Sequence, residues 1–310
     1  VAYGATTFLY IGEVCRYLVQ SPPHPLERAH GLRAGIGNGV RIEVAEAFRE
    51  RFAVPVMREF YGSTEGNAFC LNVEGVPGMI GRLAPGMTIV RCDPTTGELE
   101  RGPDGWCVEV EPGDSGLLIG RINPLVTFDG YADTAATDRK ILTDVFKEGD
   151  AWFNTGDLIQ RHERFWMSFV DRLGDTYRWK GENISTTEVG ALLGMAPGVV
   201  ECVVYGVQVP GSEGRAGMVA LVAGPDFTME AFEAYVREQV PRLQQPRFVR
   251  LLEGQIETTG TFKLRKVDYQ REGLDLTQVH DPIHALLPEG YARLTSEHLS
   301  ALEAGTLTVP

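Results

Sequence analysis

The most informative stretch of this sequence is a glycine-rich segment, Tyr61-Gly62-Ser63-Thr64-Glu65-Gly66. Glycines let a backbone approach a ligand closely and present its amide donors, as in loops that hold phosphates. Thr64 adds a hydroxyl, Glu65 supplies a hard oxygen ligand suited to Mg²⁺ beside phosphates, and Tyr61 offers a ring on which a base can stack. The segment therefore predicts a nucleotide-binding loop, with a plain glycine turn as the alternative for the motif taken alone.

Two competing interpretations of the glycine-rich segments fail on spacing. A serine nucleophile elbow would need a serine where Thr64 stands, and no partner histidine is suggested. The second segment, Gly35-Ile36-Gly37-Asn38-Gly39, resembles a dinucleotide loop, but its last glycine falls at the wrong offset. A turn is therefore the default there, and a Rossmann dehydrogenase is not supported.

Three further segments carry charged side chains next to glycines. Asp157 follows Thr155 and Gly156, where its carboxylate could accept hydrogen bonds from both ribose hydroxyls. Arg172 opens a run dense in charge and glycine and could donate a fork of hydrogen bonds to phosphate or ribose oxygens. Lys263 follows a polar turn, where an ammonium could stabilise developing negative charge. Taken singly, the three have plainer interpretations as a turn, a solvated hairpin and a surface lysine.

Composition and charge exclude several classes of protein. The chain has 310 residues, of which 43% are hydrophobic, and 42 Asp and Glu outnumber 29 Lys and Arg, for a net charge of −13. Such an acidic chain repels phosphate backbones, so nucleic-acid binding is not expected. The longest apolar runs, such as Ala216 to Ala223, fall short of the roughly 20 residues that span a bilayer, although peripheral membrane contact is left open.

Cysteine and histidine usage argues against a metal site. Five scattered cysteines form no C-x-x-C pair, which favours a reducing cytosol. His280 and His284 have helical spacing, but Pro282 between them argues against a shared helical face.

Hydrophobic patterning divides the chain near Asp171 and Arg172. The stretch from Arg41 to Phe52 has apolar residues at four-residue spacing and predicts an amphipathic helix. Glycines and prolines recur from Gly78 to Gly120, which predicts a small β-subdomain. Ser185 and Glu188 predict a capping box at a helix start. Beyond it, strands are expected at 201–207, 218–222 and 248–252 and a helix at 229–240, which together indicate an α+β domain.

The motifs occur together in an order that resembles the adenylate-forming superfamily of acyl-CoA synthetases, luciferases and peptide-synthetase adenylation domains. Within it, the chain resembles the fatty-acid transport protein and very-long-chain acyl-CoA synthetase branch. The stretches that carry this resemblance are Tyr10 to Leu18, Phe60 to Asn67, Val170 to Val189 and Thr259 to Lys263. The resemblance implies an α/β fold: part of a large AMP-binding domain with its β-subdomain over residues 1–171, and a small, mobile α+β lid domain over residues 172–310.

The resemblance also implies roles for individual residues. Tyr61 would lie against adenine, Thr64 near the phosphates and Glu65 on Mg²⁺. Asp157 would hold the ribose hydroxyls with help from Arg172, and Lys263 would bridge the substrate carboxylate and the α-phosphate. The remaining residues expected to line the ATP and CoA sites are Gly37, Asn38, Gly39, Gly62, Ser63 and Gly181.

The implied activity is the joining of a long or very long chain fatty acid to CoA through an acyl-AMP intermediate, with ATP and Mg²⁺. The alternative is a fatty-acid uptake or binding protein that keeps the fold without catalysis. The family's phosphate loop would precede Val1, so we expect a C-terminal part of a longer enzyme with little adenylation activity by itself. A cytoplasmic location is expected, with membrane association left open.

Overall fold

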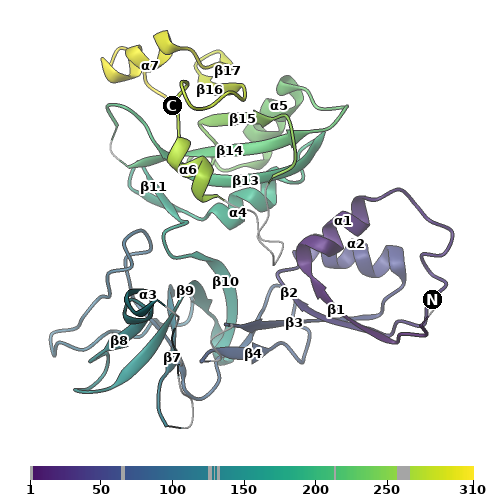
Figure 1. Ribbon diagram of the computed structural model, residues 1–310, viewed down its shortest axis with the longest axis vertical. Helices are drawn as coiled ribbons and strands as arrows, with labels where there is room; N and C mark the ends of the chain where they lie inside the picture. Colours follow the sequence, from purple (N-terminus) through teal and green to yellow (C-terminus); the bar gives the residue numbers. More distant parts are fainter. Residues whose placement is uncertain are drawn as a thin grey trace. The chain divides into compact units, whose positions relative to one another are not determined.

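The computed structural model describes residues 3–63, 67–124, 128, 130, 133–212, 214–256 and 266–310, and its chain divides into two units, Val1–Val170 and Asp171–Pro310 (Figure 1). Thr64, Glu65 and Lys263 lie outside the described residues.

The first unit begins with a parallel sheet of β1 (Thr7–Ile11), β2 (Ala34–Asn38) and β3 (Val56–Gly62), extended by antiparallel β4 (Phe69–Leu71). Helices α1 (Gly12–Gln20) and α2 (Ile42–Phe52) lie side by side on one face of these strands (Figure 1). The amphipathic helix expected over 41–52 is confirmed by α2, whose Phe48 is buried. The opposite face carries Leu9 and Ile36, which are both exposed.

The β-subdomain is a second sheet. Its strands follow the order β5 (Gly81–Arg82), β10 (Trp166–Arg172), β9 (Ala151–Arg161), β7 (Ser115–Arg121) and β6 (Met87–Val90), with β8 (Ile141–Thr143) paired to β9. Helix α3 (Thr134–Asp138) and the 3₁₀ turn η1 (Glu163–Phe165) complete it. Its core forms two clusters, one around Leu118 and Ile159 and one around Leu117 and Ile119. Alternate residues of β7 therefore serve different cores, as the alternation of side chains along a strand allows.

The second unit is an α+β domain. It opens with a hairpin of β11 (Tyr177–Trp179) and β12 (Glu182–Ile184), followed by a five-stranded sheet in the order β13 (Val199–Gln208), β14 (Arg215–Ala223), β15 (Phe248–Leu252), β16 (Ile283–Leu287) and β17 (Gly290–Arg293). Strands β14 and β15 are parallel, and α5 (Met229–Gln239) connects them. The other helices are α4 (Thr186–Leu193), α6 (Val267–Glu272) and α7 (Ser296–Glu303). Ser185 caps α4 as expected, because its side chain accepts a bond from the Glu188 amide.

A buried carboxylate holds the beginning of this unit together. Asp171 is only 1% exposed. Its Oδ2 accepts hydrogen bonds from the Thr186 amide at 2.6 Å and the Thr186 hydroxyl at 3.0 Å, and its Oδ1 accepts one from the Thr187 hydroxyl at 3.1 Å. The Nζ atom of Lys266 contacts the same Thr186 hydroxyl at 2.6 Å and forms an ion pair with Asp175 at 2.9 Å. One carboxylate thus connects the start of the unit, α4 and the residue that precedes α6.

All five cysteines are thiols rather than disulfides. Burial raises the pKa of Cys15, Cys70 and Cys92 to about 11. Of the helices in the described ranges, none has the length and hydrophobicity needed to cross a bilayer.

Two glycines of the second unit should respond oppositely to alanine. At Gly190, inside α4, an added Cβ would find its nearest neighbour at 3.8 Å, the Cγ2 atom of Val204. We expect Gly190→Ala to raise the free energy of unfolding by about 1 kcal/mol, because alanine favours helix and restricts the unfolded chain. At Gly217, in β14, an added Cβ would lie 2.3 Å from the buried Tyr177 hydroxyl oxygen. Gly217→Ala should lower the free energy of unfolding by about 1–3 kcal/mol through overpacking.

Urea unfolding of the whole chain, with hydrogen exchange of the β13 and β14 amides as the local readout, measures both changes. If both variants raised the free energy of unfolding, or both lowered it, the packing described for Gly190 and Gly217 would be contradicted.

Candidate nucleotide-binding site

Tyr61 and Asp157 are in direct contact, although they come from motifs 96 residues apart. Tyr61 lies near the end of β3 and is buried, and its hydroxyl donates a hydrogen bond of 2.6 Å to Oδ2 of Asp157 in β9. Burial, followed by the neighbouring Asp157 carboxylate, raises the pKa of the Tyr61 phenol. The phenol therefore stays protonated and acts as a donor that orients the carboxylate. The structure thus brings together an aromatic ring and a carboxylate that the sequence suggested separately.

The Thr155-Gly156-Asp157 segment is an irregularity within a strand rather than the turn that we considered as its plainer interpretation. The pairing of β7 with β9 shifts register between Leu117 and Ile119, opposite this segment. Gly156 has φ 78°, which favours glycine, and the Thr155 hydroxyl donates to the Leu118 carbonyl at 2.7 Å. Such bulges re-aim side chains and are frequent beside active sites. Here the bulge presents Asp157 to Tyr61.

The two glycine-rich segments of the first unit leave the same edge of a sheet. β2 and β3 are parallel, and Gly37 is paired with Glu59. The carboxyl ends of the two strands therefore lie at the same edge of the sheet, where Gly39 follows β2 and Tyr61 and Gly62 end β3. Ligands of open parallel sheets bind outside the carboxyl ends of the strands. Gly37, Asn38 and Gly39 therefore lie at the edge that also carries Tyr61.

Ser63 adds an unsatisfied hydroxyl to this edge. Its amide donates to the Ala68 carbonyl at 3.0 Å, but within the described ranges its buried Oγ atom has no hydrogen-bond partner. A buried hydroxyl without a partner is costly, and a ligand that bonds to it removes the cost. The Ser63 hydroxyl is thus suited to contact a polar ligand atom at this edge.

The remaining candidates belong to the second unit or fall outside the described residues. Arg172 is exposed at the end of β10. Gly181 forms, with Lys180, the two-residue turn of the β11–β12 hairpin, and their φ values of 91° and 48° are those of a type I′ turn. Thr64, Glu65 and Lys263 are not described, so their assignments stay predictions. Elsewhere in the described chain, no three His, Cys, Asp or Glu side chains are grouped to hold a metal ion.

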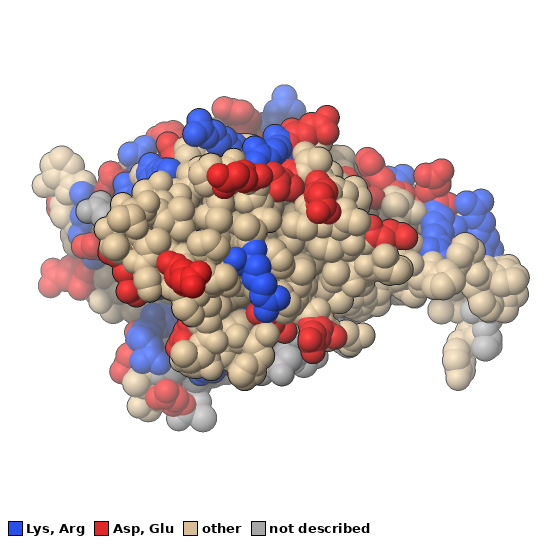
Figure 2. Space-filling view, turned by 90° about the horizontal axis from the view of Figure 1, so that it is seen from above, with Lys and Arg blue, Asp and Glu red and all other residues tan. Residues whose placement is uncertain are grey.

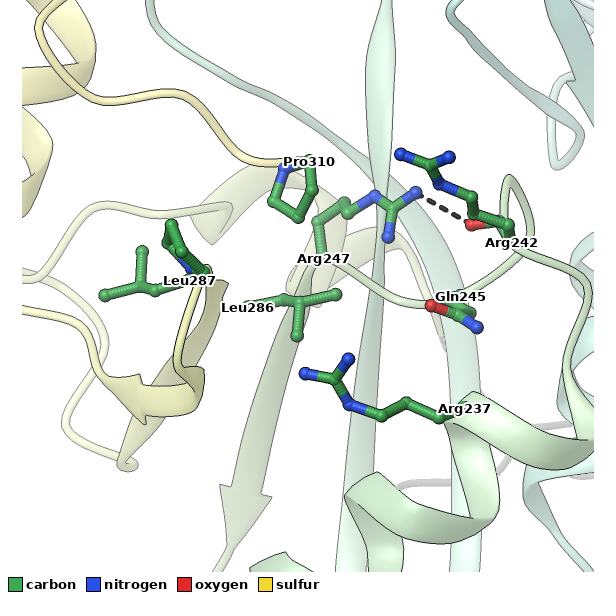
Figure 3. Close-up of a pocket in the computed structure, with 8 residues that line it drawn as sticks. Arg237, Arg242, Gln245, Arg247, Leu286, Leu287 and Pro310 are labelled. Atoms are coloured by element: carbon green, nitrogen blue, oxygen red, sulfur yellow. Dashed lines mark hydrogen bonds between the residues drawn. The ribbon is translucent and has the colours of Figure 1, made fainter.

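Sequence reasoning missed a pocket in the second unit (Figure 3). This cavity of about 480 Å³ is lined by Arg237, Arg242 and Arg247, with Gln245, Leu286 and Leu287 among the other lining residues. In the view of Figure 3, Arg237 reaches toward the cavity from one side, and the guanidinium groups of Arg242 and Arg247 lie near each other on the other side. No motif marks these arginines, which lie on α5, on the loop after it and just before β15. Only folding brings them together with Leu286 and Leu287 at the end of β16.

Arg247 is the unusual member of this set because it is 2% exposed. Its Nη2 donates to the Arg242 carbonyl at 2.8 Å, but its Nε has no hydrogen-bond partner in the described part of the chain. Arg237, by contrast, is paired with Glu233 at 2.8 Å. Burial lowers the pKa of Arg247. A buried cation without an anion is costly, so the pocket is suited to an anionic group.

One face of the described surface carries charges of both signs (Figure 2). On the face that Figure 2 shows, acidic and basic side chains are interspersed. The sequence as a whole has 42 acidic and 29 basic residues, so both signs are expected on the surface.

The chain is similar to known proteins over nearly its whole length. Residues 188–263 match the family model described as AMP-binding enzyme C-terminal domain. The chain is 41% identical over 309 residues to the medium/long-chain-fatty-acid–CoA ligase FadD6 of Mycobacterium tuberculosis, covering 98% of this chain and 51% of that protein. It is 43% identical over 316 residues to human long-chain fatty acid transport protein 3, covering 98% and 46%. The chain thus spans about half the length of these relatives.

Solved structures share the fold. An anthranilate–CoA ligase in complex with anthranoyl-AMP matches with a TM-score of 0.69 at 17% identity, over 90% of this chain and 51% of that one. An ATP-bound RpMatB-BxBclM chimera matches with a TM-score of 0.66 at 21% identity, over 88% and 52%. The α/β fold with its β-subdomain and small α+β domain is therefore confirmed.

Asp157 should contribute strongly to adenine nucleotide binding. A carboxylate that accepts ribose hydroxyl bonds makes charge-assisted interactions, each of about 1.5–3 kcal/mol. We expect Asp157→Ala in the complete protein to make the free energy of ATP binding less favourable by about 1.5–3 kcal/mol. Asp104 is exposed, and the control Asp104→Ala should leave the affinity for ATP unchanged. Calorimetric titration with ATP measures both, and an unchanged dissociation constant for Asp157→Ala would remove this residue from the site.

Proposed function

Because the chain belongs to the AMP-binding enzymes, in the branch of the fatty-acid–CoA ligases and long-chain fatty acid transport proteins, we propose that the complete protein joins a long or very long chain fatty acid to CoA at the expense of ATP. The single observation that carries this proposal is the 2.6 Å contact between the Tyr61 hydroxyl and Asp157. This contact places an aromatic ring that could stack on adenine beside a carboxylate that could accept hydrogen bonds from ribose, next to the edge of a parallel sheet.

The first unit would hold the nucleotide. Adenine would lie against the Tyr61 ring and the Gly37–Gly39 turn. The ribose hydroxyls would donate to Asp157, whose carboxylate Tyr61 orients, with Arg172 assisting. The Gly62 and Ser63 region would face the phosphates together with Thr64, because the buried Ser63 hydroxyl has no partner among the described residues. Each group is suited to its part by the chemistry of its donors and acceptors.

The first reaction is displacement at the α-phosphorus. The fatty-acid carboxylate oxygen forms a bond to this phosphorus while the bond to the β-phosphate bridging oxygen breaks, releasing pyrophosphate and leaving acyl-AMP. Lys263 would neutralise charge on the carboxylate and α-phosphate as the bonds exchange. Glu65, a hard oxygen donor, fits Mg²⁺, which when bound would neutralise phosphate charge.

In the second reaction the CoA thiol gives its proton to solvent and the sulfur attacks the acyl carbon, while the bond between this carbon and the AMP oxygen breaks. The thioester forms and AMP leaves. Gly181, at the tip of the β11–β12 hairpin, would border the path of the pantetheine arm. The arginine pocket would take phosphates of CoA, because it offers guanidinium groups, one of them buried without a carboxylate partner in the described ranges.

A second candidate function is fatty-acid uptake or binding without ligation. This alternative is supported by the names of relatives that are 41–43% identical to this chain, because they are called long-chain fatty acid transport proteins. Acyl-CoA formation by the complete protein separates the two: thioester product supports the ligase, whereas fatty-acid binding without ATP-dependent product supports the alternative.

Lys263 should matter only in the first reaction. Lys263→Ala in the complete protein is expected to lower acyl-AMP formation by about 100-fold or more, because the ammonium stabilises charge in that transition state. CoA transfer to preformed acyl-AMP should be spared. Pyrophosphate release measures the first step and thioester formation the second. Equal loss in both would contradict the assignment.

The arginine pocket should affect CoA alone. Arg242→Ala removes an exposed guanidinium of the pocket, and we expect it to raise the KM for CoA about tenfold with the KM for ATP unchanged. Arg293→Ala, an exposed arginine on β17, is the matched control. A CoA KM that is the same in both variants would exclude the pocket as the phosphate site.

A further inference from the structure

A half-buried carboxylate lies beneath the Gly37–Gly39 turn. Glu59 sits on β3 directly beside Gly37 of β2, which in turn is paired with Tyr10 of β1. Oε1 of Glu59 accepts a 2.7 Å hydrogen bond from the Tyr10 hydroxyl, and Oε2 accepts one of 2.9 Å from the Gly39 amide. The side chain therefore connects β1, β3 and the turn after β2.

The surroundings leave the turn little freedom. A Cβ at Gly37 would lie 2.3 Å from Cδ2 of Tyr10, so only glycine lets the phenol pass across β2 to Glu59. On the other side, a Cβ at Gly12 would lie 2.0 Å from the Gly39 carbonyl oxygen. Gly39 itself has φ 70°, a conformation that favours glycine. Burial and the Glu59 carboxylate raise the pKa of Tyr10, so its hydroxyl remains a donor.

The carboxylate also decides what kind of ligand the turn can take. Consecutive backbone amides ahead of a helix, here those of Gly39 and Val40 before α2, form the kind of site that binds phosphate in glycine-rich loops. Glu59 already accepts the Gly39 amide from within the protein. A phosphate at this position would meet a carboxylate instead of open donors. The turn is therefore suited to border a ligand rather than to hold its phosphates.

We propose that Glu59 and Tyr10 are positioning residues that fix the Gly37–Gly39 turn as a wall of the adenine pocket. This inference rests on the proposed function. It explains why a segment that looks like a dinucleotide loop would contact the base and not the phosphates. Tyr10 and Glu59 touch no substrate themselves and act through the turn, which leaves the same sheet edge as Tyr61.

The test compares variants of the complete protein. Tyr10→Phe removes one hydroxyl, and Glu59→Ala removes the carboxylate. Tyr3→Phe, 99% exposed, and Glu50→Gln, also exposed, are matched controls. We expect Tyr10→Phe to raise both the KM for ATP and the dissociation constant of AMP about fivefold. Glu59→Ala should raise the same two quantities about 30-fold or more. The KM for CoA should not change in any variant.

The pattern of changes separates positioning from a merely structural role. A residue that only stabilises the fold would lower the active fraction, and hence the apparent kcat, with the KM for ATP unchanged; that result would overturn the proposal. Wild-type AMP affinity in both Tyr10→Phe and Glu59→Ala would overturn it too. If the unaltered protein binds AMP but forms no acyl-AMP, the proposed ligase function fails, and the AMP affinities of the variants still decide the role of Glu59. If it binds no adenine nucleotide, both proposals fail.

Discussion

The carboxylate of Asp171 is the constraint on which the second unit depends. A charged group with 1% exposure would be costly to bury unless donors surround it. Those donors come from an amide at the start of α4 and from threonine hydroxyls. The positive end of the α4 backbone dipole adds to them. Lys266 reaches the same cluster through the Thr186 hydroxyl, so the start of the unit, α4 and the residue before α6 form one network.

Each unit carries a different part of the proposed chemistry. The first unit holds its glycine-rich candidates at the ends of β2 and β3, where a parallel sheet presents backbone and side-chain groups to a ligand, and holds Asp157 at a bulge within β9. The second unit holds the arginine pocket, whose lining comes from α5, the loop after it and the end of β16. The geometry of a strand edge suits a flat base, whereas guanidinium groups suit phosphates.

The fold was more predictable than the site. The spacing of Val44, Phe48 and Phe52 indicated α2, and Ser185 marked the start of α4, because both signals are local. The contact between Tyr61 and Asp157 depends on how two sheets pack. The two residues are 96 positions apart in the sequence, and no local pattern predicts a contact over such a distance along the chain. For the same reason Thr155-Gly156-Asp157 could be taken for a turn, since the register shift that makes it a bulge involves β7. No sequence motif indicated the arginine pocket, because its arginines come from separate elements and lie near one another only in the folded domain.

The buried thiols have a practical consequence for spectroscopy. With pKa values of about 11, Cys15, Cys70 and Cys92 are thiolates in only roughly one molecule in ten thousand at pH 7, and thiol reagents attack the thiolate. Cys107 and Cys202 are buried as well. A cysteine introduced on the surface of each unit would therefore react with a maleimide or spin label far faster than the native thiols do. Pairs of such labels could report the separation of the two units in solution, with each ligand in turn, while every natural cysteine stays in place.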